Sequence, residues 1–300
     1  MFNPTEKPYA ARLYMALAVS LLIGVLAIQC QPLNSSSRAA NNSIPGPQAN
    51  TPQPIKDENP AEKQDKLPPG RRPVAVIYEH NPWATVIGSD SPSFALYDDG
   101  LVIFARRVEG KRGEYFSAVL TEQERSALVS SLPVEQFFKL EPRYETTLMT
   151  DQPTTVMYLW HNGERKAVSV YGGLRRTDND RGQPAPAAFT ETYEKLHDFE
   201  LARATPWMPE KIEMMVWPYD AAGDALSWPK NWPDTNHPET KKRGDGSDSI
   251  AYSIYLTRQQ YETFRERASA SSQNAVLING RKWAFSFRLP FPGEDVWRKR

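Results

Sequence analysis

The sequence has little cysteine and no excess of charge of either sign. Its 300 residues include one cysteine, Cys30, and 36 Lys and Arg residues balance 36 Asp and Glu residues. A nucleic-acid-binding domain usually has a basic excess or a basic face, so this balance argues against a nucleic-acid partner. Because no cysteine follows residue 30, disulfides, thiolate catalysis and cysteine–metal sites are excluded from the rest of the chain.

Common motifs of catalysis and cofactor binding are also missing. The sequence contains no G-x-S-x-G, Walker A or G-x-G-x-x-G motif. Its four histidines, His80, His161, His197 and His237, show none of the spacings with which a helix holds zinc. We therefore expect no metal and no cofactor.

The N-terminus carries the pattern of an export signal. Lys7 and Arg12 precede an apolar run, Leu13–Ile28, whose length of about 16 residues is short for a membrane span. Residues 1–30 are therefore predicted to be a signal peptide or a lipoprotein signal. Cys30 follows a glutamine, where lipoproteins usually have a small residue. Three outcomes stay open: cleavage with lipidation of Cys30, plain cleavage, or retention of the segment as an anchor.

The segment that follows, residues 31–72, is rich in Asn, Ser, Pro, Gln and Lys and has no aromatic residue. Such a segment cannot bury enough apolar surface to offset the entropy that ordering would cost. It is predicted to be a disordered tether between a membrane and a folded body. The alternative is a processing remnant that has no role as a spacer.

Residues 73–206 are predicted to form a first α+β domain. The strongest signal is Asn162-Gly163 between two runs rich in β-formers, because both central residues of a type I′ hairpin turn need positive φ. Thr121 and Glu124 form a capping box, which predicts a helix that Pro133 ends. The remaining elements expected here are a strand at Val74–Tyr78, a hairpin of Ser93–Tyr97 with Leu101–Arg106, and a helix over Ala187–Ala204.

Residues 207–300 are predicted to form a second α+β unit. Strands are expected at Lys211–Trp217 and Asp248–Leu256, and a capping box at Thr257 and Gln260 begins a helix. A hairpin with Asn279-Gly280 at its turn follows. The fold class expected for the whole is α+β, with antiparallel sheets and helices on one face. The shared order of elements suggests two ββαββ-type units, with chance recurrence as the alternative.

Several short motifs occur in one order in the first unit: PSFALYDDGLVIF, AVLTEQE, TDQPTT, VSVYGG and LHDFE. Together they resemble a bacterial exported domain of unknown function, over about residues 73–206. The resemblance implies an exported compartment and an α+β fold, and no activity. Members of that family often carry cysteines before the first Pro-aromatic motif, whereas this chain has Ser91 and Ser93, so a thiol or metal role is absent there.

Three Trp-Pro pairs, which begin at Trp217, Trp228 and Trp232, are the most unusual feature of the second unit. Proline stiffens the backbone and indole offers a flat face, a combination that suits glycan or proline-rich ligands. These residues are the candidate ligand-binding site. In the alternative interpretation the indoles fold inward and hold a long loop against the sheet.

The sequence favours an exported protein of the cell envelope, periplasmic or at the cell surface, with a binding or structural role. Its expected partners are a protein or glycan of the envelope and, through the N-terminus, a membrane. The second hypothesis is an envelope hydrolase with a site between the two units, built from Asp151, Asp178 or His197. Two acidic loops, around Asp178 and Asp245, lack the ligand pattern of an EF-hand and are expected to be solvated.

Overall fold

The computed structural model describes residues 71–298, apart from residues 85, 87, 109–110, 175–181, 219–223, 244–250 and 272–274. The predicted signal, Cys30 and the tether up to residue 70 lie outside the described residues. The described residues belong to one compact unit, which contains two sheets. Among the described residues, no helix has the length and apolar character needed to cross a membrane.

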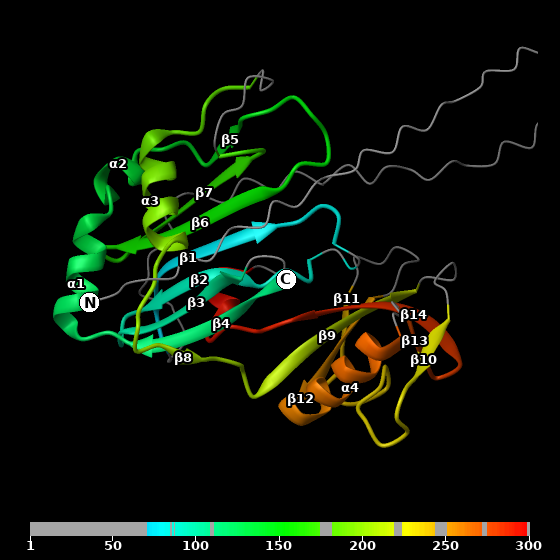
Figure 1. Cartoon of the computed structure of the whole chain (residues 1–300). Coiled ribbons are helices and arrows are strands. Elements are labelled where there is room, and N and C mark those ends of the chain that lie inside the picture. Colours follow the sequence, from blue (N-terminus) through cyan, green and yellow to red (C-terminus); the bar gives the residue numbers. More distant parts are fainter. Residues whose placement is uncertain are drawn as a thin grey trace, which may run out of the picture. The chain divides into compact units, whose positions relative to one another are not determined.

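The first sheet has eight strands in the order β5-β7-β6-β1-β2-β3-β4-β8 (Figure 1). Its neighbouring strands are antiparallel except for the edge pair β5 and β7, which is parallel. The strands are β1 (Pro73–His80), β2 (Pro92–Tyr97), β3 (Leu101–Val108), β4 (Lys111–Val119), β5 (Arg143–Glu145), β6 (Thr154–His161), β7 (Glu164–Tyr171) and β8 (Thr205–Pro206).

Three helices, α1 (Glu122–Ser131), α2 (Val134–Phe138) and α3 (Ala187–His197), cover one side of this sheet (Figure 1). The predicted capping box begins α1, with both of its hydrogen bonds present. Alternate side chains of the strands point to the same face of a sheet, and here they meet the helices in the main core. Its fully buried members include Phe94, Leu96, Met157, Phe137 and Phe189.

The other side of the first sheet is covered by the chain's last described residues, 289–298, called here the C-terminal segment. It contains the short helix η2 (Glu294–Val296). Phe291 and Trp297 of this segment are 4 % and 3 % exposed and pack in a cluster with Tyr97 and Trp160 of the sheet. The Tyr97 hydroxyl donates a hydrogen bond of 2.9 Å to the Pro292 carbonyl.

The second sheet has six strands in the order β10-β13-β14-β9-β12-β11. Helix α4 (Arg258–Ser271) lies on one face, where Phe264 packs with Met214, Val216 and Ile254 (Figure 1). Within this second sheet, β10 and β13 are the only parallel pair among the described strands. The strands are β9 (Lys211–Pro218), β10 (Ala225–Ser227), β11 (Lys241–Arg243), β12 (Ala251–Thr257), β13 (Ala275–Ile278) and β14 (Arg281–Arg288).

Both predicted Asn-Gly hairpins are confirmed. Asn162 and Gly163 have φ of 51° and 77°, and Asn279 and Gly280 have the same two values. Positive φ at both central residues is the conformation that a type I′ turn requires. The turns set the registers of β6 with β7 and of β13 with β14.

Two expectations for the first unit need correction. The helix predicted over residues 187–204 ends at His197, because the chain turns there and brings Phe199 edge-on against Phe94 and Phe104. Strand β4 was not expected. Its first half is charged and contains a glycine, but its main chain completes the ladder of β3.

The predicted α+β class is confirmed. Both sheets are mixed, because each has a parallel pair of strands at one edge. The repeat of a ββαββ unit is not confirmed, because the strand orders differ. The hairpin of the first sheet joins β1 through its first strand, β6, whereas the hairpin of the second joins β9 through its second strand, β14. The chain passes from one sheet to the other between Trp207, which contacts Tyr115, and Lys211.

Candidate functional site

The loop between β10 and β11, residues 228–240, holds two of the predicted ligand-binding tryptophans. We call it the Trp-Pro loop. Hydrogen bonds within the loop hold it together. The Trp228 indole N–H donates a hydrogen bond of 3.0 Å to the Pro233 carbonyl, and the Thr240 hydroxyl donates one of 2.7 Å to the Asp234 carbonyl. The Asn279 amide, at the turn of the last hairpin, donates 3.0 Å to the Thr235 hydroxyl. A long loop with such internal packing can hold side chains in fixed positions.

The structure separates the three predicted tryptophans. Trp228 and Trp232 lie edge to face with ring centroids 5.5 Å apart, and both pack against Phe264 of α4. Trp217 alternates with Met214 and Val216 along β9, so it lies on the opposite face of the sheet. The three indoles therefore form no common flat platform. Trp228 and Trp232 fold inward against the helix, as in the alternative interpretation of this loop.

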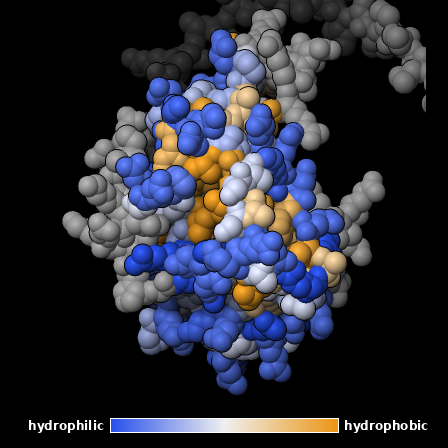
Figure 2. Space-filling view, turned by 90° about the vertical axis from the view of Figure 1, so that its left-hand side faces the viewer, coloured by the Kyte–Doolittle hydropathy of each residue, from blue (hydrophilic) through white to orange (hydrophobic). Residues whose placement is uncertain are grey.

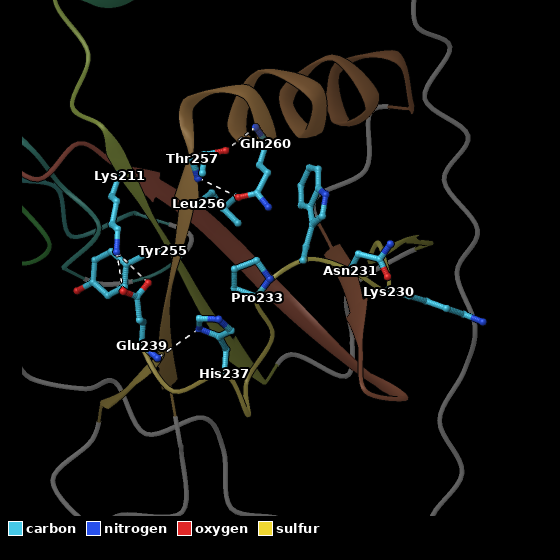
Figure 3. A pocket seen from close by; sticks show the side chains of 11 residues that line it. Lys211, Lys230, Asn231, Pro233, His237, Glu239, Tyr255, Leu256, Thr257 and Gln260 are labelled. Atoms are coloured by element: carbon cyan, nitrogen blue, oxygen red, sulfur yellow. Dashed lines mark hydrogen bonds and ion pairs between the residues drawn. The ribbon is translucent and has the colours of Figure 1, made fainter.

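Trp232 also lines a pocket between the Trp-Pro loop and the junction of β12 with α4. The cavity has a volume of about 450 Å³, in the range of small-molecule sites. Figure 3 shows its polar side chains, which come from the loop, from β9 and from the first turn of α4. The lining residues are Lys211, Lys230, Asn231, Trp232, Pro233, His237, Glu239, Tyr255, Leu256, Thr257 and Gln260.

An ion pair joins the strand to the loop at this pocket. The Lys211 ammonium lies 2.7 and 2.8 Å from the two carboxylate oxygens of Glu239. This hydrogen-bonded cation lowers the pKa of Glu239, which therefore stays ionised at neutral pH. The main-chain N–H of Glu239 donates a hydrogen bond of 3.2 Å to Nδ1 of His237. The ring of that histidine is therefore fixed as well.

The capping box of α4 contributes to the same pocket. The Thr257 main-chain N–H donates 2.9 Å to Oε1 of Gln260, and the Gln260 main-chain N–H donates 3.3 Å to the Thr257 hydroxyl. The prediction of this cap from the sequence is confirmed. Its side chains were expected to cap the start of a helix, and they also form a wall of the cavity (Figure 3).

A second polar group of residues is buried on the face of the second sheet away from α4. Arg288 is 2 % exposed and donates to the carboxylates of Glu213 and Glu294 and, over 3.3 Å, to the Asp90 carbonyl. Arg243 also donates to Glu213. Burial alone would raise the pKa of Glu213, but Arg288 and Arg243 lower it to about 2. We call these residues the ion cluster; it joins β9, β14, β11 and the C-terminal segment.

The residues proposed for a hydrolase make separate contacts. The Asp151 carbonyl accepts a 3.0 Å hydrogen bond from the Trp83 indole, and Asp151 has a φ of 57°. Nδ1 of His197 lies 2.8 Å from Asp198, and its ring stacks on Tyr193. Asp178 and the acidic loop at Asp245 lie outside the described residues. Within the described ranges, no three His, Cys, Asp or Glu side chains gather as a metal site would require.

Apolar side chains are exposed elsewhere on the first sheet. Figure 2 shows the face on the left of Figure 1, where α1 and α2 lie, and apolar residues gather there within a polar surround. Trp83, Leu148 and Met149 are 74 %, 78 % and 65 % exposed in two loops, which the bond from Trp83 to Asp151 ties together.

Sequence reasoning found the Trp-Pro loop but not the pocket's polar residues. Lys211 and Glu239 are far apart in sequence and meet only because β9 and β11 flank β12. Gln260 was singled out, as a cap. The comparisons with known proteins match the chain to no protein-family model, no curated protein and no solved structure.

Proposed function

We infer that the protein is an exported, membrane-tethered binding module of the cell envelope, and that its pocket beside the Trp-Pro loop binds a glycan. The observation that carries this proposal is the pocket itself. It combines the indole of Trp232 with amide, imidazole and ammonium groups on a rigid loop. Apolar rings with a few placed hydrogen-bonding groups are typical of small-molecule sites.

The dimensions of the site favour a sugar unit over a folded protein. A stable protein–protein interface buries about 800 Å² of each partner over a broad surface. The pocket is instead a concave cavity of about 450 Å³, which suits one or two rings of a larger glycan. A protein partner is the other ligand class expected from the sequence, and it would use the exposed loops at Trp83 and Leu148.

The state of several glutamates favours binding over general-acid catalysis. A general acid near neutral pH needs a raised pKa. The described glutamates with a displaced pKa, Glu122, Glu124, Glu213 and Glu239, all have it lowered by bonded cations or caps. The Lys211–Glu239 pair thus holds the loop as two opposite charges, with the carboxylate of Glu239 ionised.

The test is binding of the purified full chain to immobilised envelope polysaccharides and to a panel of oligosaccharides. We expect saturable binding by at least one of them, weakened at least tenfold in a Lys230→Ala, Asn231→Ala double variant. These side chains line the pocket and are exposed, so the fold should tolerate their loss. Trp83→Ala, at an exposed indole of the first sheet, is the control and should bind normally.

Two results would contradict this function. Either the wild type binds no glycan, or the double variant binds as well as the wild type. The proposed export and tethering are tested separately by mass spectrometry of the mature N-terminus in cells. A diacylated Cys30 supports a lipid anchor, whereas an uncut chain or an unmodified Cys30 argues against it.

A further inference from the structure

Two side chains in the pocket have their hydrogen-bond acceptors occupied by the main chain. Oε1 of Gln260 accepts the Thr257 main-chain N–H in the capping box, at 2.9 Å. A glutamine amide has one oxygen and one NH₂ group. With the oxygen held by the helix end, the NH₂ group is the part of Gln260 that remains for a ligand. Figure 3 shows this side chain reaching from α4 toward the loop.

His237 is restricted in the same way. Its Nδ1 accepts the Glu239 main-chain N–H at 3.2 Å, so this nitrogen carries the lone pair. In a neutral imidazole the proton then sits on Nε2, which becomes a donor. His237 and Gln260 come from opposite sides of the cavity, one from the loop and one from the helix, with Pro233 between them (Figure 3). Each therefore offers a ligand a donor, the NH₂ group of Gln260 and Nε2–H of His237.

The charges of the lining also favour a ligand that accepts hydrogen bonds and carries a negative charge. The lining contains two lysines, Lys211 and Lys230, and one glutamate, Glu239, so it has a net charge of one positive unit. The carboxylate of Glu239 is held by Lys211 through both oxygens, at 2.7 and 2.8 Å. Lys230 is exposed and extends from the rim. The indole of Trp232 can only donate.

We propose that this pocket selects a carboxylate-bearing sugar unit, such as a uronic acid, within the glycan. The inference rests on the proposed function and names the ligand class of the same site. The ligand's carboxylate would accept from the Gln260 NH₂ group and from Nε2–H of His237, with Lys230 balancing its charge. Charge-assisted hydrogen bonds of this kind are stronger than those to a neutral hydroxyl.

The probes are a galacturonic acid trisaccharide and the same trisaccharide with its carboxyl groups reduced to alcohols. Calorimetric titration of the full chain should show at least tenfold tighter binding of the acidic trisaccharide. Its affinity should fall as salt concentration rises, because the lysines supply long-range attraction. A Glu-Glu-Glu peptide, which carries carboxylates without sugar rings, should bind at least tenfold more weakly than the acidic sugar.

Gln260→Glu is the decisive variant. A glutamate at this position keeps the capping box, since Ser or Thr followed three residues later by Glu is the common form of that motif. The melting temperature should therefore stay the same, while the NH₂ donor becomes a negative oxygen facing the ligand. Affinity for the acidic trisaccharide should fall at least tenfold, and affinity for the reduced one should be unchanged.

The matched control is Glu124→Gln, the reverse exchange in the capping box of α1, which should leave the affinities for both trisaccharides unchanged. Lys230→Ala is a second pocket variant and should weaken acidic binding severalfold. Equal affinity of the wild type for both trisaccharides would overturn carboxylate selection and leave glycan binding standing. Tighter binding of the glutamate peptide would overturn the sugar assignment, and binding of no glycan would refute the proposed function itself.

Discussion

The two sheets bury different chemistry on the faces turned away from their helices. On the first sheet, Tyr97 and Trp160 meet Phe291 and Trp297 of the C-terminal segment in an aromatic layer. On the second sheet, the corresponding face holds the ion cluster, in which Glu213 is fully buried. Apolar layers stabilise by area and tolerate small displacements, whereas an ion cluster is stable only when each charge meets its partner.

The two faces therefore have different roles in the structure. The aromatic layer supplies stability to the first sheet. The ion cluster fixes a geometry, because Arg288 reaches Glu213 on a neighbouring strand, Glu294 in the C-terminal segment and the Asp90 carbonyl before β2. Residues from both sheets and from the segment must be in place together for this arginine to be satisfied.

Loss of Arg288 should give the largest effect. Arg288→Ala leaves Glu213 and Glu294 buried without their main cation, and breaking a buried pair in this way costs about 3–5 kcal/mol. Urea unfolding measures it. Arg143→Ala, which removes an exposed pair with Glu145, is the control and should cost less than about 1 kcal/mol. Similar losses in the two variants would mean that the ion cluster contributes no more than a surface pair.

Acid should weaken the ion cluster of the second sheet. The pKa of Glu213 is about 2 in the folded protein against 4.5 as its ordinary value, so the unfolded chain binds the proton more tightly. Its contribution is complete above about pH 4.5 and is lost as the pH falls toward 2, an effect of roughly 3 kcal/mol. Stability measured from pH 6 to pH 2 should fall less steeply in Glu213→Gln than in the wild type.

Salt separates this effect from that of exposed carboxylates. Glu124 also has a pKa lowered to about 2, by a hydrogen bond from Arg203 and by the Thr121 cap, but it lies at the surface. Salt at about 1 M screens exposed pairs and hardly affects buried ones. The difference between the wild type and Glu213→Gln should therefore persist in high salt. If it disappears, the buried pair is not its source.

A matched pair of turn variants should give the smallest effect. Gly163 and Gly280 both have a φ of 77°, and a Cβ built on either meets nothing within 4 Å. Alanine at either position should therefore cost only backbone strain, about 1–2 kcal/mol. If the two sheets unfold as one unit, Gly163→Ala and Gly280→Ala shift the same transition equally. Two transitions, each moved by one variant only, would show that the sheets unfold separately.

Local signals in the sequence predicted much of this fold. The two Asn-Gly turns and the two capping boxes each depend on a few neighbouring residues, and all four are confirmed. The edge strands β5, β8, β10 and β11 were missed, because they have two or three residues each and exist only through pairing. Such strands have no periodicity of their own to detect.

The ion cluster and the pocket could not be predicted for a related reason. Glu213 occurs within an apolar strand and Arg288 at the end of another, and nothing local indicates that they pair. Their partnership depends on β9 lying beside β14, which is a property of the strand order. The polar lining of the pocket depends likewise on the neighbours of β12. Turns and caps that depend on neighbouring residues could be predicted from the sequence. Contacts between residues far apart in the sequence could not.

The C-terminal segment has a consequence for biosynthesis. Phe291 and Trp297 follow the last strand of the second sheet, so the ribosome makes them after every strand of both sheets. Until then a nascent chain displays the uncovered side of the first sheet, with Val76, Tyr97 and Ile103 in contact with water. A bare sheet of this kind invites aggregation or chaperone binding, so assembly of the first half has to wait for translation of the second.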